Sequence, residues 1–180
     1  MENGRIEEKD LRALISSLQL PPVILEIYDE NIKDPQVAEY FDETYSKPES
    51  ILSLTGEEQK IYQTDRFVPL LEIDNSLIIA YDTERKGYVD YYLESDPMDS
   101  PLYTWDGVFL EQVTLWFEDE MDEDEILHLG KTLHLKHVPE ILESLMEAEE
   151  DGELDTFEGK DQWMTTELKK WNMVLAEKTQ

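Results

Sequence analysis

The sequence predicts an α+β fold in which a three-stranded antiparallel β-meander packs against N- and C-terminal helices. Apolar residues recur at helical spacing between residues 6 and 47, change to β-strand spacing between 66 and 94, and return to helical spacing from residue 104. Helices and strands that are segregated along a chain in this way are typical of α+β domains.

Three helices are expected before the strands. The first covers Ile6–Leu18, because its apolar residues follow the spacing i, i+3, i+4, i+7 of one helix face: Leu11, Leu14, Ile15 and Leu18. Pro22 suits the first turn of a second helix, with a strand over Val23–Tyr28 as the alternative. Asp34-Pro35 marks the start of a third helix, which Lys47-Pro48 ends.

Three strands are expected in the middle of the chain. Arg66–Ile73 is β-prone, and Pro69 within it indicates an edge strand or a bulge. Leu77–Tyr81 is a continuous apolar run that fits a buried central strand. After a loop in which Gly87 is available for a positive φ, Tyr88–Glu94 alternates between apolar and polar residues, so one face of the meander is expected to be covered.

Four helices are expected after the strands, over residues 104–117, 122–135, 138–146 and 160–178. The first three have inward-facing positions at helical spacing: Val108, Phe109, Gln112, Val113, Trp116, Ile126, Leu129, Leu133, Val138, Ile141, Leu142 and Leu145. The last places Met164, Leu168, Trp171 and Leu175 on one face. The expected organisation is an α+β domain over residues 1–148, a flexible acidic linker over 149–159, and a C-terminal amphipathic helix over 160–180.

The charge balance limits the possible partners. The 180 residues include 44 acids and 15 bases, a net charge of −29, which argues against nucleic acid or an anionic membrane and favours a basic protein partner. The absence of cysteine excludes disulfides and a cysteine nucleophile. No apolar run approaches the roughly 20 residues of a membrane span, and the N-terminus lacks the apolar core of a signal peptide, so a cytoplasmic protein is expected.

The sequence predicts no catalytic residue, cofactor or metal site. His134 and His137 are close enough in sequence to share a metal, but they span an expected helix junction, and no zinc-hydrolase motif surrounds them. No serine occupies a nucleophile-elbow motif, and no glycine-rich loop is present to bind phosphate. We therefore do not expect an enzyme.

Two acidic surfaces are the candidate partner-binding sites. The first is a run of seven carboxylates: Glu118, Asp119, Glu120, Asp122, Glu123, Asp124 and Glu125. These acids either complement a basic partner or lie in a solvated loop at the N-terminus of the next helix, where the helix dipole favours negative charge. The second is the polar face of the third strand, formed by Tyr88, Asp90, Tyr92 and Glu94. Tyrosines beside acids are typical of partner surfaces, and the alternative is that a helix covers this face.

Residues 147–158 allow a further interpretation as an EF-hand calcium loop. Carboxylates fall at most of the ligand positions, with Gly152 at the turn. The first ligand is Glu147, where such loops have aspartate, so an acidic connection between helices is the alternative.

Several segments also resemble the SUKH superfamily across residues 18–146. They are Leu20-Pro21-Pro22 with the following helix, Phe67–Leu71, Ile78–Asp82, Gly87–Glu94 and Leu115–Glu118. The resemblance implies a non-enzymatic binding protein, because the superfamily includes bacterial immunity proteins that neutralise toxins, many of them nucleases, and fungal regulators of cell-wall glucan synthesis. We expect an immunity protein that occludes a toxin with a basic surface; a regulatory or scaffold module is the alternative, and a calcium-responsive adaptor is a third.

Overall fold

The computed structural model describes residues 5–177, which fall into two units that are described separately. Among the described residues, the first unit covers residues 5–102 and Glu177, and the second covers Tyr103–Ala176. Residues 103–148, which the sequence analysis placed in the first domain, therefore belong to the second unit together with the C-terminal helix.

The predicted meander is present in the first unit and gains one short strand. It consists of β1 (Tyr45–Ser46), β2 (Phe67–Ile73), β3 (Leu77–Asp82) and β4 (Gly87–Tyr92), each antiparallel to the next. The strand order within the first unit follows the sequence. Two further short strands, β5 (Leu102–Tyr103) and β6 (Val174–Ala176), come later in the chain. The α+β prediction is confirmed.

The predicted bulge at Pro69 is also confirmed. The register between β2 and β3 shifts between Pro69 and Leu71. On the other side of β2, β1 pairs only with Glu72 and Ile73, so Pro69 has no ladder bond to give up there. A proline, which lacks the N–H donor, is tolerated at such a position.

The expectation of a buried central strand over Leu77–Tyr81 is confirmed by β3, whereas the expectation of one covered face is wrong for β2, which is buried on both faces. All seven residues of β2 and five of the six in β3 are buried. Their sequences are mainly apolar instead of alternating, as expected for strands that lack a solvent-facing side, and the acids Glu72 and Asp82 are buried with them. Alternation is preserved only in β4, where Val89 and Tyr91 are buried and Tyr92 is exposed.

The backbone conformation predicted for the turns is found in the β2–β3 hairpin but not in the β3–β4 hairpin. Asp74 and Asn75 both have positive φ in the β2–β3 turn, as their residue types predict. In the β3–β4 turn, by contrast, Lys86 takes the left-handed conformation at φ 60°, and Gly87 pairs with Asp82 as the first residue of β4. The expected role of Gly87 is therefore wrong.

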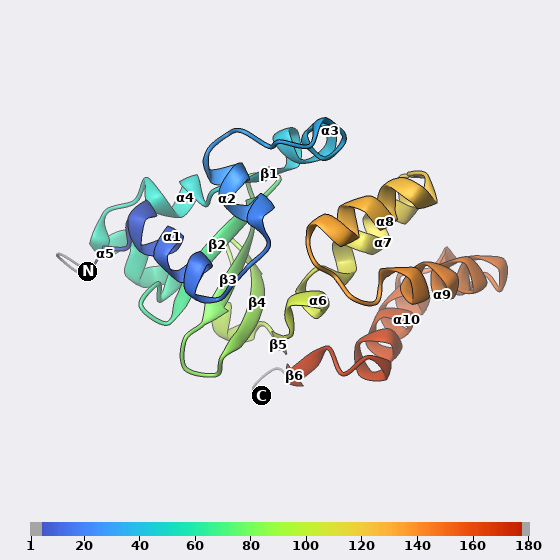
Figure 1. Ribbon diagram of the computed structural model, residues 1–180. Helices are drawn as coiled ribbons and strands as arrows, with labels where there is room; N and C mark the ends of the chain where they lie inside the picture. Colours follow the sequence, from blue (N-terminus) through green and yellow to red (C-terminus); the bar gives the residue numbers. More distant parts are fainter. Residues whose placement is uncertain (1–4, 178–180) are drawn as a thin grey trace. The chain divides into compact units, whose positions relative to one another are not determined.

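The helices of the first unit begin and end close to the predicted residues. They are α1 (Glu8–Ser17), α2 (Pro22–Tyr28) and α3 (Pro35–Thr44), so the strand alternative for 23–28 is wrong. The short helices α4 (Glu49–Leu52) and α5 (Gly56–Gln59) and the 3₁₀ turn η2 (Lys60–Tyr62) were not predicted. In Figure 1 α1 and α2 lie against the sheet, where α1 contacts β2 and α2 contacts β1.

The second unit contains five helices among the described residues: α6 (Trp105–Val108), α7 (Leu110–Glu118), α8 (Glu123–Thr132), α9 (Val138–Glu150) and α10 (Phe157–Lys170). The single helix expected over 104–117 is divided at Phe109, whose ψ of 0° breaks the helical path. All twelve inward positions predicted for the first three helices are nevertheless buried.

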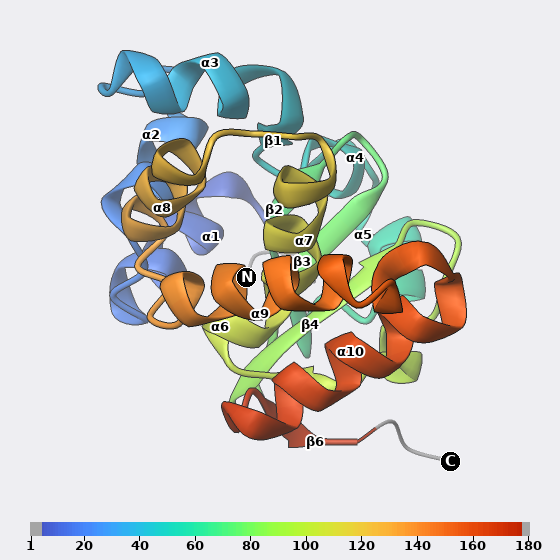
Figure 2. The same cartoon turned by 90° about the vertical axis from the view of Figure 1, so that its right-hand side faces the viewer.

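The expected linker over 149–159 is wrong in length. Helix α9 continues to Glu150 and α10 begins at Phe157, with only the 3₁₀ turn η4 (Glu153–Asp155) and its flanking residues between them. Figure 2 shows α9 and α10 side by side, and hydrogen bonds join Ser144 to Trp163 and Glu167. The acidic segment is a tight connection between packed helices.

The inward face predicted for the last helix is also wrong. Trp163 and Glu167 are the buried residues of α10, and Leu175 is 52% exposed. The helix ends at Lys170 because Asn172 takes a positive φ of 53°, and β6 follows. Residues 178–180 of the expected helix lie outside the described residues.

Candidate functional site

The acidic run 118–125 surrounds the start of α8. Glu118 is the last residue of α7, Asp122 is the N-cap of α8, and Glu123, Asp124 and Glu125 form its first turn. Carboxylates are stabilised there by the positive end of the helix dipole. The structural interpretation as a helix N-terminus therefore holds for Asp122–Glu125. Glu118, at the end of α7, forms an ion pair with Lys160 Nζ at 2.7 Å.

A groove of about 410 Å³ joins the start of α8 to one face of α9. Its lining combines carboxylates with apolar side chains: Glu123, Pro139, Glu143, Met146, Glu147 and Glu150. Positions 143, 147 and 150 follow i, i+4 and i+7, so they share one face of the helix. We call this set of six residues the acidic groove.

Among the residues that the structure describes, the carboxylates of the acidic groove have no cationic partner. Within residues 5–177, the side chains of Glu123, Glu143, Glu147 and Glu150 make no hydrogen bond or ion pair. Met146 lines the same groove and is 39% exposed, so a flexible apolar side chain is accessible next to the carboxylates. Glu123 belongs to the predicted partner-binding run, whereas the α9 acids were not predicted to bind a partner, although their helical spacing is visible in the sequence.

The whole second unit is strongly acidic. Residues 103–176 contain 20 acids against 5 bases, a net charge of −15. Two of these bases are engaged internally, since Lys160 pairs with Glu118 and Lys170 with Glu167. The field around this unit is therefore negative at neutral pH.

The second candidate surface, on β4, is only partly formed as expected. Tyr88, Asp90 and Tyr92 alternate along the strand, whereas Glu94 lies in the turn that follows it, so the expected extension of the strand to Glu94 is wrong. Tyr88 is half-buried with its ring edge-on to Tyr81 at 5.5 Å, and burial raises its pKa to about 12. Tyr92 is 54% exposed.

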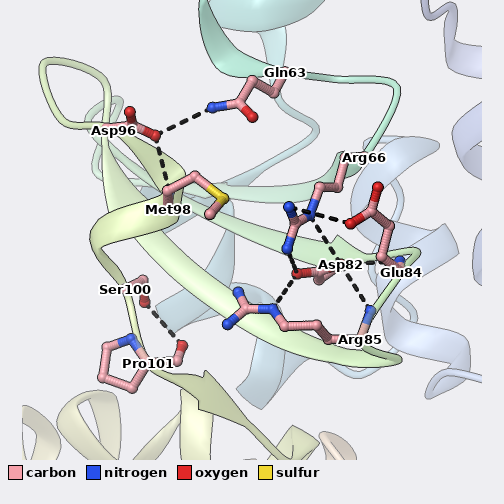
Figure 3. Close-up of polar contacts among 9 residues, drawn as sticks. All are labelled: Gln63, Arg66, Asp82, Glu84, Arg85, Asp96, Met98, Ser100 and Pro101. Atoms are coloured by element: carbon pink, nitrogen blue, oxygen red, sulfur yellow. Dashed lines mark hydrogen bonds and ion pairs between the residues drawn. The ribbon is translucent and has the colours of Figure 1, made fainter. Parts of the chain in front are cut away.

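Asp90 lies in a small pocket of about 260 Å³ in the first unit. Its Oδ1 accepts a hydrogen bond from Ser100 Oγ at 2.9 Å. Burial raises the pKa of the Asp90 carboxyl, and the Ser100 hydrogen bond opposes that shift. Tyr92, Asp96, Asp99, Ser100 and Pro101 also line the pocket, and Figure 3 draws Asp96, Ser100 and Pro101. The two candidate surfaces thus belong to different units.

The calcium-loop interpretation does not fit the backbone. Helix α9 continues through Glu147 and Glu149 to Glu150, so the twelve residues do not form a loop around a common centre. In the described part of the chain, no group of three or more histidine, cysteine, aspartate or glutamate side chains is placed to hold a metal ion. His134 has a left-handed backbone after α8, and His137 stacks on the Trp171 ring at 4.4 Å.

A buried ionic cluster that the sequence analysis missed closes the β3–β4 hairpin (Figure 3). Asp82 is fully buried, and its Oδ2 accepts hydrogen bonds from Arg66 Nη2 at 3.1 Å and Arg85 Nε at 2.5 Å. Its Oδ1 accepts from the backbone N–H groups of Glu84 and Arg85 at 2.9 and 3.0 Å. Arg66 also pairs with Glu84 at 3.2 Å. Both carboxylate oxygens of Asp82 are satisfied, whereas Arg85 Nη2 is buried without a hydrogen-bond partner in the described chain. We expect the cluster to stabilise the hairpin through the Asp82 hydrogen bonds.

No family model matches the chain, and neither the curated proteins nor the solved structures give a match. No helix within residues 5–177 is both long enough and apolar enough to cross a membrane.

Proposed function

We propose that this chain is a non-enzymatic protein-binding module whose second unit binds a cationic protein in the acidic groove. The observation that carries the proposal is the set of four unpaired carboxylates around Pro139 and Met146. Unpaired charges of one sign on two neighbouring helices repel each other, and a cationic partner relieves that repulsion on binding.

The acidic groove and the surrounding charge act at different ranges. The field of a unit with net charge −15 attracts a basic partner from beyond contact distance and increases the association rate. Once the partner is in contact, Met146 and Pro139 supply apolar surface and the carboxylates select lysine and arginine side chains.

We further propose that the binding serves as immunity, in which the chain occludes the basic surface of a toxin in the cytoplasm. The resemblance to the SUKH superfamily supports this role, and a nuclease toxin has a cationic surface because its substrate is polyanionic. Occlusion requires no turnover, which agrees with the absence of catalytic motifs from the sequence.

Neutralising the α9 side of the acidic groove is expected to slow binding. Glu143→Gln/Glu147→Gln/Glu150→Gln should lower the association rate for the partner by about three- to tenfold at low salt and weaken its salt dependence, because steering charges act chiefly on association. The partner is first captured from the native host, identified by mass spectrometry and purified, and association is then measured by surface plasmon resonance at two salt concentrations.

The control variant changes the net charge by the same amount elsewhere. Glu39→Gln/Glu43→Gln/Asp65→Asn replaces three exposed acids of the first unit. Equal association rates for the two triple variants contradict the proposal, since the effect then belongs to net charge and not to the acidic groove. Capture of only a mixture of basic proteins that moderate salt removes contradicts it as well.

A further inference from the structure

Phe157 is the most exposed large apolar side chain in the described chain, with 92% of its surface accessible. It is the first residue of α10 and follows the acidic turn η4. An aromatic ring of this size gains free energy when it is removed from water, so an exposed one on a folded helix is a strong candidate for a partner contact.

The backbone that presents Phe157 is held firmly in place. Thr156 caps α10 by accepting a hydrogen bond from the Gly159 N–H at 3.1 Å. A Cβ on Gly159 would lie 2.0 Å from the Glu153 carbonyl oxygen, so the first turn of α10 packs directly on η4, and only glycine fits there. A contact residue that is already positioned loses less conformational entropy when the partner binds.

The residues that flank Phe157 are acidic. Glu153, Asp155 and Glu158 are exposed, and among residues 5–177 their side chains have no ion-pair partner. The nearest base in the sequence, Lys160, is already bound to Glu118. Phe157 is therefore flanked in the sequence by exposed carboxylates that have no cationic partner within residues 5–177.

We infer that this surface, defined by Phe157, Glu153, Asp155 and Glu158, binds an arginine-bearing segment of the partner. The planar, weakly hydrated guanidinium stacks on an aromatic face while its N–H groups remain free to donate to carboxylates. A lysine ammonium is a compact and strongly hydrated charge that gains less from the ring. The inference rests on the proposed function and adds to it the type of side chain that is recognised.

The test compares fluorescently labelled oligoarginine and oligolysine of equal length by anisotropy titration at low salt. Phe157→Ala and Phe157→Leu should each weaken oligoarginine binding by about threefold, the amount expected from loss of one exposed cation–π contact, and leave oligolysine binding unchanged. Leucine keeps an apolar side chain without the aromatic face. Ile61→Ala in the first unit is the control, because Ile61 is 73% exposed and no aromatic ring is lost.

Retention of wild-type oligoarginine affinity by Phe157→Leu overturns the inference, as does an equal loss of affinity for both peptides or in the Ile61 control. These results leave the acidic groove unaffected, because its residues are unchanged in the Phe157 variants. The proposed function fails separately if Glu143→Gln/Glu147→Gln/Glu150→Gln binds both peptides as tightly as the wild type, whatever the Phe157 variants show.

Discussion

Replacing Asp82 with alanine is expected to lower the free energy of unfolding by about 3 kcal/mol, the low end of the cost of breaking a buried ion pair. Asp82 is fully buried, and its removal leaves Arg66 and Arg85 without their shared carboxylate. The two arginines are each about one-fifth exposed, so water compensates them in part. Urea denaturation of Asp82→Ala and the wild type measures the loss.

Asp82→Asn separates the charge from the turn. The amide oxygen still accepts the N–H groups of Glu84 and Arg85, whereas the ion pairs are lost. We expect asparagine to cost about half as much as alanine. If Asp82→Ala unfolds at the wild-type denaturant concentration, the cluster contributes nothing measurable to stability, and the role assigned to it is wrong.

The pH dependence of the Asp82 contribution follows from its pKa. Burial raises the pKa of this carboxyl, but hydrogen bonds from Arg66 and Arg85 outweigh burial and lower it from 3.8 to about 2. A carboxyl whose pKa is lower in the folded than in the unfolded state stabilises the fold at pH values above its unfolded-state pKa. That stabilisation is lost as the pH falls through the folded-state pKa. The stability advantage of the wild type over Asp82→Asn should disappear between pH 5 and pH 2, because protonation of Asp82 removes about 2 kcal/mol of stability from the wild type over this range. A constant difference contradicts this assignment.

Replacing Glu167 with alanine is expected to cost about 3 kcal/mol of stability in the second unit, since buried hydrogen-bond donors lose their acceptor. Glu167 is almost fully buried, and it accepts hydrogen bonds from Ser144 Oγ at 2.9 Å and Trp171 Nε1 at 2.8 Å. Lys170 Nζ lies 3.1 Å from the same carboxylate. Denaturation followed by tryptophan fluorescence measures the effect.

Glu167→Gln is the matched control for this variant. Glutamine has the same length and keeps one acceptor oxygen for Ser144 or Trp171 while losing the charge that pairs with Lys170. It should recover more than half of the stability lost in Glu167→Ala. If both variants unfold at the same denaturant concentration as the wild type, the hydrogen bonds between α9 and α10 do not stabilise the packing of these helices.

Local spacing determined much of this fold. Helix α2 follows from Pro22 at a first turn, and the inward positions of α8, such as Ile126 and Leu129, follow from periodicity alone. The bulge at Pro69 was visible because proline lacks an N–H. Burial produces this periodic spacing because successive helical turns, or alternate residues of a strand, must place their apolar side chains on the same face.

Only the tertiary structure decided which distant residues meet. Arg66 reaches Asp82 across the β2–β3 pairing, and Ser144 on α9 meets Glu167 on α10. A buried charge on an amphipathic helix is invisible to periodicity, so the inward face of α10 was assigned to Leu168 when Glu167 occupies it. The acidic groove likewise needs Glu123 beside the glutamates of α9. Composition alone determined that this chain is acidic, but packing between helices decided where the unpaired carboxylates gather, because the distance between two side chains depends on the path of the whole backbone between them.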